Sequence, residues 1–195
     1  TLSMPSNLGT IAKAYATPTK IAEYQPGELP TILDLYVLTY DADKKLRSAS
    51  SLIKRNLRTY LAEYRMINDS IKIKDAFVIN IEVVFDIIVL PNYNNSEVLT
   101  KCIDSLSNYF DIDDWQINQP ILFSDLYVLL DKVEGVQTVK KIQINNLTGE
   151  ALGYSSFAYD IPGATIDDVV YPSIDPMIFE VKFPNSDIKG RVVPI

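Results

Sequence analysis

The residues of this chain that could do chemistry are its carboxylates, because its 195 residues include no histidine and only one cysteine. Asp41, Asp43 and Lys45 have the alternate spacing with which a calcium-binding loop begins. A lysine, however, occupies the third ligand position, and Leu46 stands where the loop needs a glycine. This stretch is therefore a poor candidate for a calcium site.

The other carboxylates give no better candidate. Asp111 and Asp113 have the same spacing, but Trp115 occupies the third ligand position. The chain has 25 acidic residues, and no spacing selects two of them as the carboxylate pair of a glycoside hydrolase. A serine triad or a zinc site without histidine would need unusual substitutes. We expect no metal site, no cofactor, no small-molecule substrate and no enzymatic activity.

Two other features have simple interpretations. Asn146, Leu147 and Thr148 match an N-glycosylation acceptor, which has meaning only in a secreted protein. Cys102 cannot form an internal disulfide, and its place on an apolar helix face predicts a small buried hydrophobe. This cysteine usage favours a soluble protein from a reducing compartment.

Composition and charge exclude further classes of protein. A hydrophobic content of 47% is enough to bury a core, but no apolar run reaches the roughly 18 to 20 residues that span a bilayer. The net charge of −7 argues against nucleic-acid binding, which needs a basic surface. The chain opens at Thr1 without a methionine, so we expect a fragment or a processed product.

Positive charge is concentrated in residues 44–65, where Glu63 is the single acidic residue. The basic residues of this segment are Lys44, Lys45, Arg47, Lys54, Arg55, Arg58 and Arg65. The segment carries about +6 and the rest of the chain about −13. It is either a solvated helix face or a patch that docks on an acidic surface, such as that of a neighbouring copy.

The same segment has the period of an amphipathic helix, with Asp41 or Asp43 as the N-cap. Its apolar positions recur at steps of three and four at Leu46, Ala49, Ile53, Leu57, Tyr60 and Tyr64. After residue 68 the period changes to two, which predicts a long strand that Pro91 ends. One face of this strand is apolar and contains Phe77, Ile79, Ile81, Val83, Phe85 and Ile87.

Shorter elements surround these two. Alternation and turn residues predict strands over 9–16, 32–40, 115–121 and 136–144. Helical spacing predicts helices over 97–110, capped by Asn95 or Ser96, and from Ser124 to 133, with Gly135 as a left-handed C-cap. Asn145 and Asn146 are expected to form a turn.

From Leu147 onward, glycines and prolines separate short segments rich in aromatic residues. The strongest strand signal there is 178–183, which completes the sheet or joins the sheet edge of a partner. Tyrosine and phenylalanine are also common interface anchors. The residues that we expect at a partner interface are Arg47, Lys54, Arg58, Tyr154, Phe157, Tyr159, Tyr171, Ile178 and Phe179.

The order of these elements predicts an α+β fold, with a mixed sheet covered by about three helices and a C-terminal β extension. We expect two domains. Residues 1–145 would form the α+β domain, and residues 146–195 the β-rich extension.

Four segments, read in order, resemble the baseplate J-like family of contractile phage tails, and most of all its wedge-ring subunits of the T4 type. They are LDLYVLTYD (33–41), LIKRNLRTYLAEYR (52–65), IKIKDAFVINIEVVFDIIVL (71–90) and PILFSDLYVLLDKVEGVQTVKKI (120–142). The last is the most specific, because a helix in this family leads through a Gly-Val turn into a strand. The family's glycine-rich loop before the long helix is replaced here by the short DADKKL. The resemblance covers about residues 33–144.

The resemblance implies a structural virion protein without an active site, located in the tail baseplate and assembled in the host cytoplasm. Such a subunit forms a dimer with a copy of itself, contacts other baseplate wedge proteins, and links wedges into a ring that rearranges when the sheath contracts. This chain would be the C-terminal part of a longer subunit. The alternative is a non-catalytic binding module for a carbohydrate or a peptide, which would need a concave aromatic site.

Overall fold

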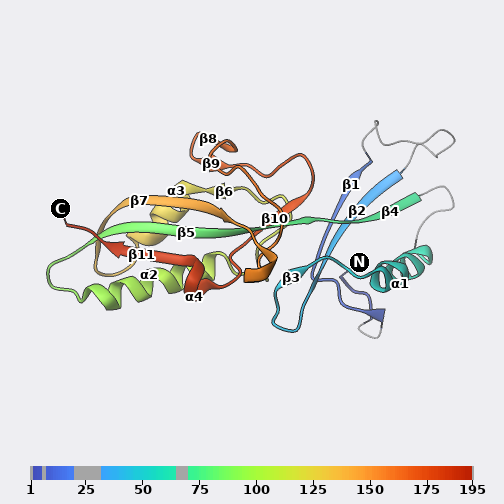
Figure 1. The fold of residues 1–195 in the computed structure, drawn as a ribbon, viewed down its shortest axis with the longest axis horizontal. Coiled ribbons are helices and arrows are strands. Elements are labelled where there is room, and N and C mark those ends of the chain that lie inside the picture. Colours follow the sequence, from blue (N-terminus) through green and yellow to red (C-terminus); the bar gives the residue numbers. More distant parts are fainter. Residues whose placement is uncertain (1, 6–7, 20–31, 65–69, 195) are drawn as a thin grey trace. The chain divides into compact units, whose positions relative to one another are not determined.

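The structure is a computed structural model that describes residues 2–5, 8–19, 32–64 and 70–194. The chain forms two compact units, Thr1–Phe77 (the N-terminal unit) and Val78–Ile195 (the C-terminal unit). Both combine strands with helices, which confirms the predicted α+β class (Figure 1). The expected boundary after residue 145 concerns independent domains and stays a prediction.

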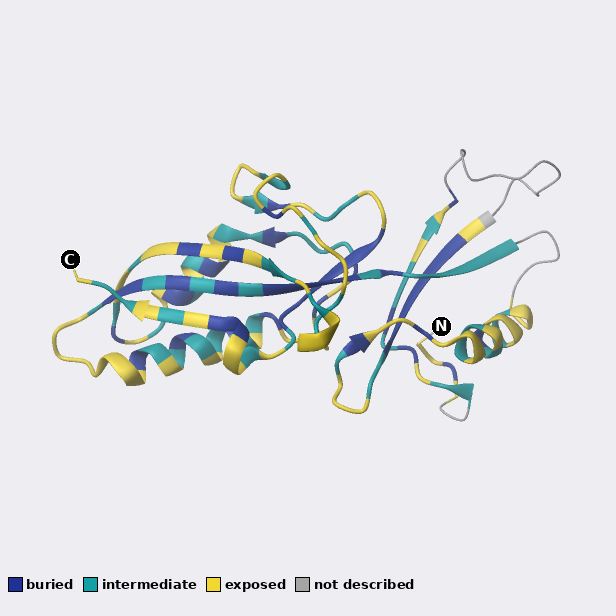
Figure 2. Ribbon diagram, viewed as in Figure 1, coloured by how far each residue is buried: buried dark blue, intermediate teal, exposed yellow. Residues whose placement is uncertain are grey.

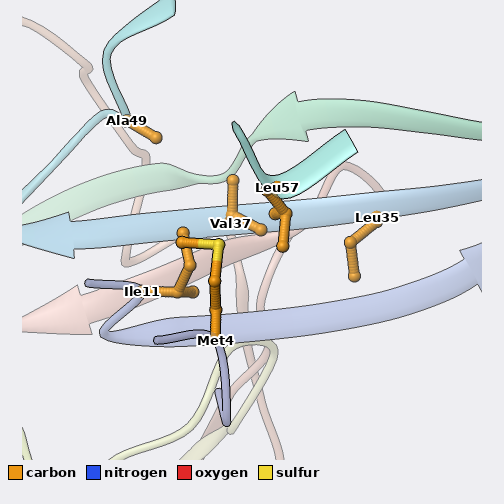
Figure 3. Close-up of a cluster of buried hydrophobic side chains, with 6 residues drawn as sticks. All are labelled: Met4, Ile11, Leu35, Val37, Ala49 and Leu57. Carbon is orange, nitrogen blue, oxygen red and sulfur yellow. The ribbon is translucent and has the colours of Figure 1, made fainter. Parts of the chain in front are cut away.

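The N-terminal unit is a four-stranded sheet with one helix, α1 (Ser51–Ala62). Its strands are β1 (Lys13–Pro18), β2 (Ile32–Tyr40), β3 (Leu46–Arg47) and β4 (Ser70–Asp75). The strand β2 lies at the centre, antiparallel to β1 and β3 and parallel to β4. The core of the unit contains six buried side chains, drawn in Figure 3, from Met4, Ile11, Leu35, Val37, Ala49 and Leu57.

The predicted start of the long helix is wrong. The Asp41 carboxylate accepts hydrogen bonds from the backbone N–H groups of Asp43 (2.9 Å) and Lys45 (2.8 Å), and so closes a turn instead of capping a helix. The turn returns the chain as β3, and α1 begins only after Ser50, whose hydroxyl accepts from the N–H of Ile53 at 3.3 Å.

The predicted long strand consists of β4 and β5 (Phe77–Val89), with Ala76 between them. Along β5, the residues of the predicted apolar face are buried from Ile79 to Ile87, as the alternating colours of Figure 2 show. On the opposite face, Asn80 is also fully buried, whereas Glu82 and Asp86 are half-buried.

The C-terminal unit is organised around β5. Here β7 (Val136–Leu147) runs antiparallel to β5, and β11 (Ile188–Val192) runs parallel to it. The helix α2 (Asn95–Tyr109) packs on β11, and α3 (Phe123–Asp131) packs on β7 (Figure 1). The remaining elements are β6 (Ile121–Leu122), a 3-10 turn (Glu150–Leu152), β8 (Thr165–Ile166), β9 (Val169–Val170), β10 (Met177–Glu180) and α4 (Pro184–Asp187).

The C-terminal segment therefore completes the sheet, which is one of the two roles predicted for it. Both β10 and β11 pair with β5, while β9 joins β8 to β6 in a small separate sheet. The predicted strand 178–183 is shorter than expected and lies one residue earlier, at Met177–Glu180. The strand β11 was not predicted.

Other boundaries also differ from prediction. Asn94 caps α2 in place of the predicted Asn95 or Ser96, because its side chain accepts from two N–H groups of the first turn. Asn145 and Asn146 continue β7, in register with Glu82 and Ile81 of β5, and form no turn.

The region around α3 departs further from prediction. Trp115 and Ile117 are buried but lie outside any strand, so the predicted strand is reduced to β6. The helix α3 begins at Phe123, one residue before the predicted Ser124, and its C-cap is Lys132. Gly135 does have the expected positive φ, +98°, but it lies at the entry to β7 and caps no helix.

Candidate interaction surfaces

The described residues include no candidate metal centre. Among them, no group of three or more histidine, cysteine, aspartate or glutamate side chains is placed to hold a metal ion. Within the same residues, no helix has the length and apolar content needed to cross a membrane. Cys102 is fully buried, and burial raises the pKa of its thiol to about 11, so it is a packing residue as predicted. Candidate functional residues are therefore sought on the surface.

The three basic residues predicted at an interface have different environments. Lys54 forms an ion pair with the Asp75 carboxylate, which also accepts the backbone N–H of Ala49 at 3.1 Å. Lys54 thus holds α1 against β4. Arg47 and Arg58 are exposed, the first on β3 and the second on α1.

The side of α1 that faces away from the core carries basic and apolar residues together. We call this side the α1 outer face, and its members are Leu52, Arg55, Arg58 and Thr59, all exposed. Tyr64 does not belong to it, because its ring lies 5.2 Å from the ring of Tyr60, which packs against the core. Leu52 is 53% exposed and Tyr64, just beyond the helix, is 71% exposed. The sequence pattern predicted Tyr64 on the core side, and its exposure corrects that prediction. Arginine and leucine side chains on one open helix face can bury apolar area and pair with carboxylates at the same time.

The predicted aromatic residues of the C-terminal segment are divided between core and surface. Ile178 and Phe179 are each 1% exposed in β10, and Phe179 packs edge-on against the ring of Tyr159 at 5.9 Å. The Tyr159 hydroxyl donates to the backbone carbonyl of Tyr171 at 2.6 Å, and burial raises its pKa. Phe157 and Tyr171 are 43% and 48% exposed. A role for any of them in binding a partner stays a prediction.

Tyr154 joins the 3-10 turn to α4. Its hydroxyl donates to the buried Asp187 carboxylate at 2.7 Å, and its ring meets Phe183 edge-on at 5.6 Å. Burial and the hydrogen bond to this carboxylate raise the pKa of Tyr154 to about 12. Tyr154 therefore has a structural role within the unit, in addition to any role at an interface.

A buried polar network that the sequence analysis missed connects the C-terminal segment to the sheet. The Asn80 side chain donates to Glu180 at 2.8 Å and accepts from the backbone N–H of Ser155 at 2.7 Å. The Asn146 side chain donates to the Asn80 carbonyl at 2.9 Å and accepts from the N–H of Tyr159 at 2.9 Å. The available signal was an asparagine in the mostly apolar strand β5, where a buried polar side chain needs hydrogen-bond partners.

Ion pairs hold β11 to the half-buried face of β5. The Lys189 ammonium lies 2.5 Å from Glu82, and the Arg191 guanidinium makes two 2.9 Å hydrogen bonds to Asp86. These hydrogen bonds lower the pKa of both carboxyl groups. The alternate residue Gly190 faces inward, where its α-carbon lies opposite Phe85.

Comparison with known proteins gives remote likeness to solved structures alone. No family model matches the chain, and neither does any curated protein. Among solved structures, it is similar to a chain in a "Cryo-EM structure of the anti-feeding prophage (AFP) baseplate, 6-fold symmetrised". The two chains are 12% identical with a TM-score of 0.47, and the match covers 94% of this chain and 34% of the other. This chain thus spans about a third of the length of that protein.

Proposed function

We propose that this chain is part of a longer structural subunit of a contractile phage tail baseplate, of the kind found in T4-like wedge rings. The subunit self-associates, contacts other wedge proteins and links wedges into a ring around the tail tube. Its function is conformational and involves no bond chemistry. The ring holds the sheath extended and rearranges through interfaces with two alternative arrangements.

The observation that carries the proposal is the resemblance of residues 33–144 to the baseplate J-like family. In the structure, the segment 33–41 lies in β2, the segment 52–65 begins in α1, and the segment 71–90 contains β4 and β5. The most specific segment, 120–142, runs from β6 through α3 and the turn at Gly135 into β7. Each segment is thus an element or a pair of elements, and each unit contains part of the resemblance. The similar solved structure is also that of a baseplate, but the proposal does not depend on that likeness.

The test is the location of the protein in tail particles. Contractile tails would be purified from the source organism and labelled with gold-coupled antibodies against this chain, with antibody pre-absorbed on the chain as the control. We expect gold at the host-proximal end of both extended and contracted tails. Unlabelled tails, with the protein recovered only in the fraction that does not sediment with them, would refute the proposal. Selective binding in a glycan array would then support the carbohydrate-binding alternative.

A further inference from the structure

The two units carry opposite net charge. Residues 1–77 contain eleven lysines and arginines against eight acidic residues, a net charge of +3. Residues 78–195 contain seven against seventeen, a net charge of −10. Opposite charges of this size on two parts of one chain favour contact between the basic part of one copy and the acidic part of another.

In each unit, some charged residues of the less common sign form ion pairs with residues of the same unit. In the N-terminal unit, the 1% exposed Asp34 pairs with Lys74 at 3.0 Å, and Asp75 pairs with Lys54. Among the described residues of this unit, the exposed arginines are Arg47, Arg55 and Arg58.

In the C-terminal unit, three of the seven basic residues are used in the same way. Lys101, Lys189 and Arg191 pair with carboxylates of their own unit. Many acidic residues outside these pairs are exposed, namely Asp104, Asp111, Asp114, Asp125, Asp131, Asp160, Asp167 and Asp168. Internal pairing therefore leaves arginines exposed on one unit and carboxylates on the other.

Among the described surfaces of the N-terminal unit, the α1 outer face is best suited to bind the exposed carboxylates of another copy. Arg55 and Arg58 lie on it beside Leu52, which is 53% exposed. Two such faces could not bind each other well, because each would bring two arginines against two arginines. An acidic surface, in contrast, would pair with the arginines while the leucine loses contact with water.

We propose that the α1 outer face of one copy docks on the acidic surface of the C-terminal unit of a second copy. The contact is heterologous, so repetition of it gives a closed ring or an open filament instead of a two-fold dimer. This inference rests on the self-association contained in the proposed function, and it assigns a surface and a direction to that association.

The experiment is sedimentation velocity of the full chain over a wide concentration range in about 0.1 M NaCl, where the Debye length is about 10 Å. The variant is Arg55→Glu/Arg58→Glu, and its fold is checked by circular dichroism. We expect the dissociation constant for self-association to rise at least about tenfold. The matched control is Lys140→Glu/Lys141→Glu, which changes the net charge equally on exposed positions of β7. It should associate at least as tightly as the wild-type chain.

A mixing experiment tests the direction of the contact. The Arg55→Glu/Arg58→Glu variant, labelled at its N-terminus, is combined with excess unlabelled wild-type chain. It should enter the complexes, because its acidic unit is intact and can receive the α1 outer face of a wild-type copy. Exclusion of the variant from the complexes would overturn the heterologous contact.

Three other results would also overturn the inference. They are a wild-type chain that stays monomeric, an arginine variant that associates normally, and a control that is weakened as much as the variant. None of these results would move gold from the end of a labelled tail, so failure of this inference is distinguishable from failure of the proposed function.

Discussion

Substitution of Gly190 by alanine tests how the C-terminal strand fits under α2. A Cβ atom at this position would lie 2.4 Å from Cζ and 2.7 Å from Cε2 of Phe85, and 2.8 Å from Cδ2 of Leu99 on α2. Carbon atoms pack best at about 3.5 to 4.0 Å, so the new methyl group would overlap two side chains by roughly 1 Å. Phe85 is 1% exposed, and its ring has little room to retreat.

Two opposing effects set the size of the expected change. Gly190 has no positive φ, so alanine fits its backbone and would reduce the entropy of the unfolded chain, which stabilises by about 0.4 to 1 kcal/mol. Overpacking of a well-packed core destabilises by about 1 to 3 kcal/mol. We therefore expect the free energy of unfolding to fall by roughly 1 to 2 kcal/mol.

Urea denaturation followed by the fluorescence of Trp115 measures this change. Trp115 is the single tryptophan of the chain, and it is buried in the C-terminal unit. With a urea dependence of about 2 kcal/mol/M, the midpoint should fall by roughly 0.5 to 1 M. In a Phe85→Leu background, where the aromatic ring is gone, Gly190→Ala should be less destabilising by about 1 kcal/mol. A neutral or stabilising Gly190→Ala, with the same effect in both backgrounds, would refute the steric reasoning.

Three more predictions concern the C-terminal unit. The Asp86 carboxyl has its pKa lowered by Arg191, so its contribution to stability is present above about pH 4 and is lost as the pH falls below that value. Arg191→Met should lower stability slightly at about pH 7, and urea titrations should show this difference vanish near about pH 2. A difference that stays constant with pH would contradict the ion pair. Asn80→Ala removes a donor to Glu180 and should destabilise by about 2 to 4 kcal/mol in the same assay, and a loss below about 1 kcal/mol would show that the network is dispensable. Cys102 has a buried thiol with a raised pKa. At about pH 8 it should react with a thiol reagent at least about 100-fold more slowly in the native chain than in urea. Equal rates would show that α2 opens freely.

Local periodicity predicted the elements whose side chains alternate between core and solvent. The strand β5 and the helix α2 were found within a few residues, because Ile81 or Leu106 shows the burial period in the sequence itself. The start of α1 was wrong because Asp41 and Ser50 are both good caps, and only the pairing of β3 with β2 decides between them. The strand β11 was missed because Gly190 interrupts its apolar face and its pairing with β5 spans about a hundred residues.

The candidate interface residues also divide into those that a local pattern predicts and those that depend on distant strand pairing. Exposed arginines on α1 followed from the helix period, since the face opposite Leu57 had to be open. The aromatic residues of the C-terminal segment could not be assigned in this way, because the same residue types fill cores and anchor interfaces. Phe179 and Tyr171 differ in burial only because β10 pairs with β5, which no local pattern encodes.

The pairing of β10 and β11 with β5 also restricts how the C-terminal segment could serve a partner. Exchange of β10 or β11 into the sheet of a neighbour would remove buried residues such as Ile178 from the sheet of their own chain. Such an exchange would separate Asn80 from Glu180 and Asp86 from Arg191. Loss of the buried hydrogen bond from Asn80 to the Glu180 carboxylate alone opposes it by about 1.5 to 3 kcal/mol. Binding through Phe157 or Tyr171, which are already exposed, requires no such separation. A partner that uses this segment is therefore expected to bind its exposed side chains first, and strand exchange is left for a rearrangement that replaces the lost contacts.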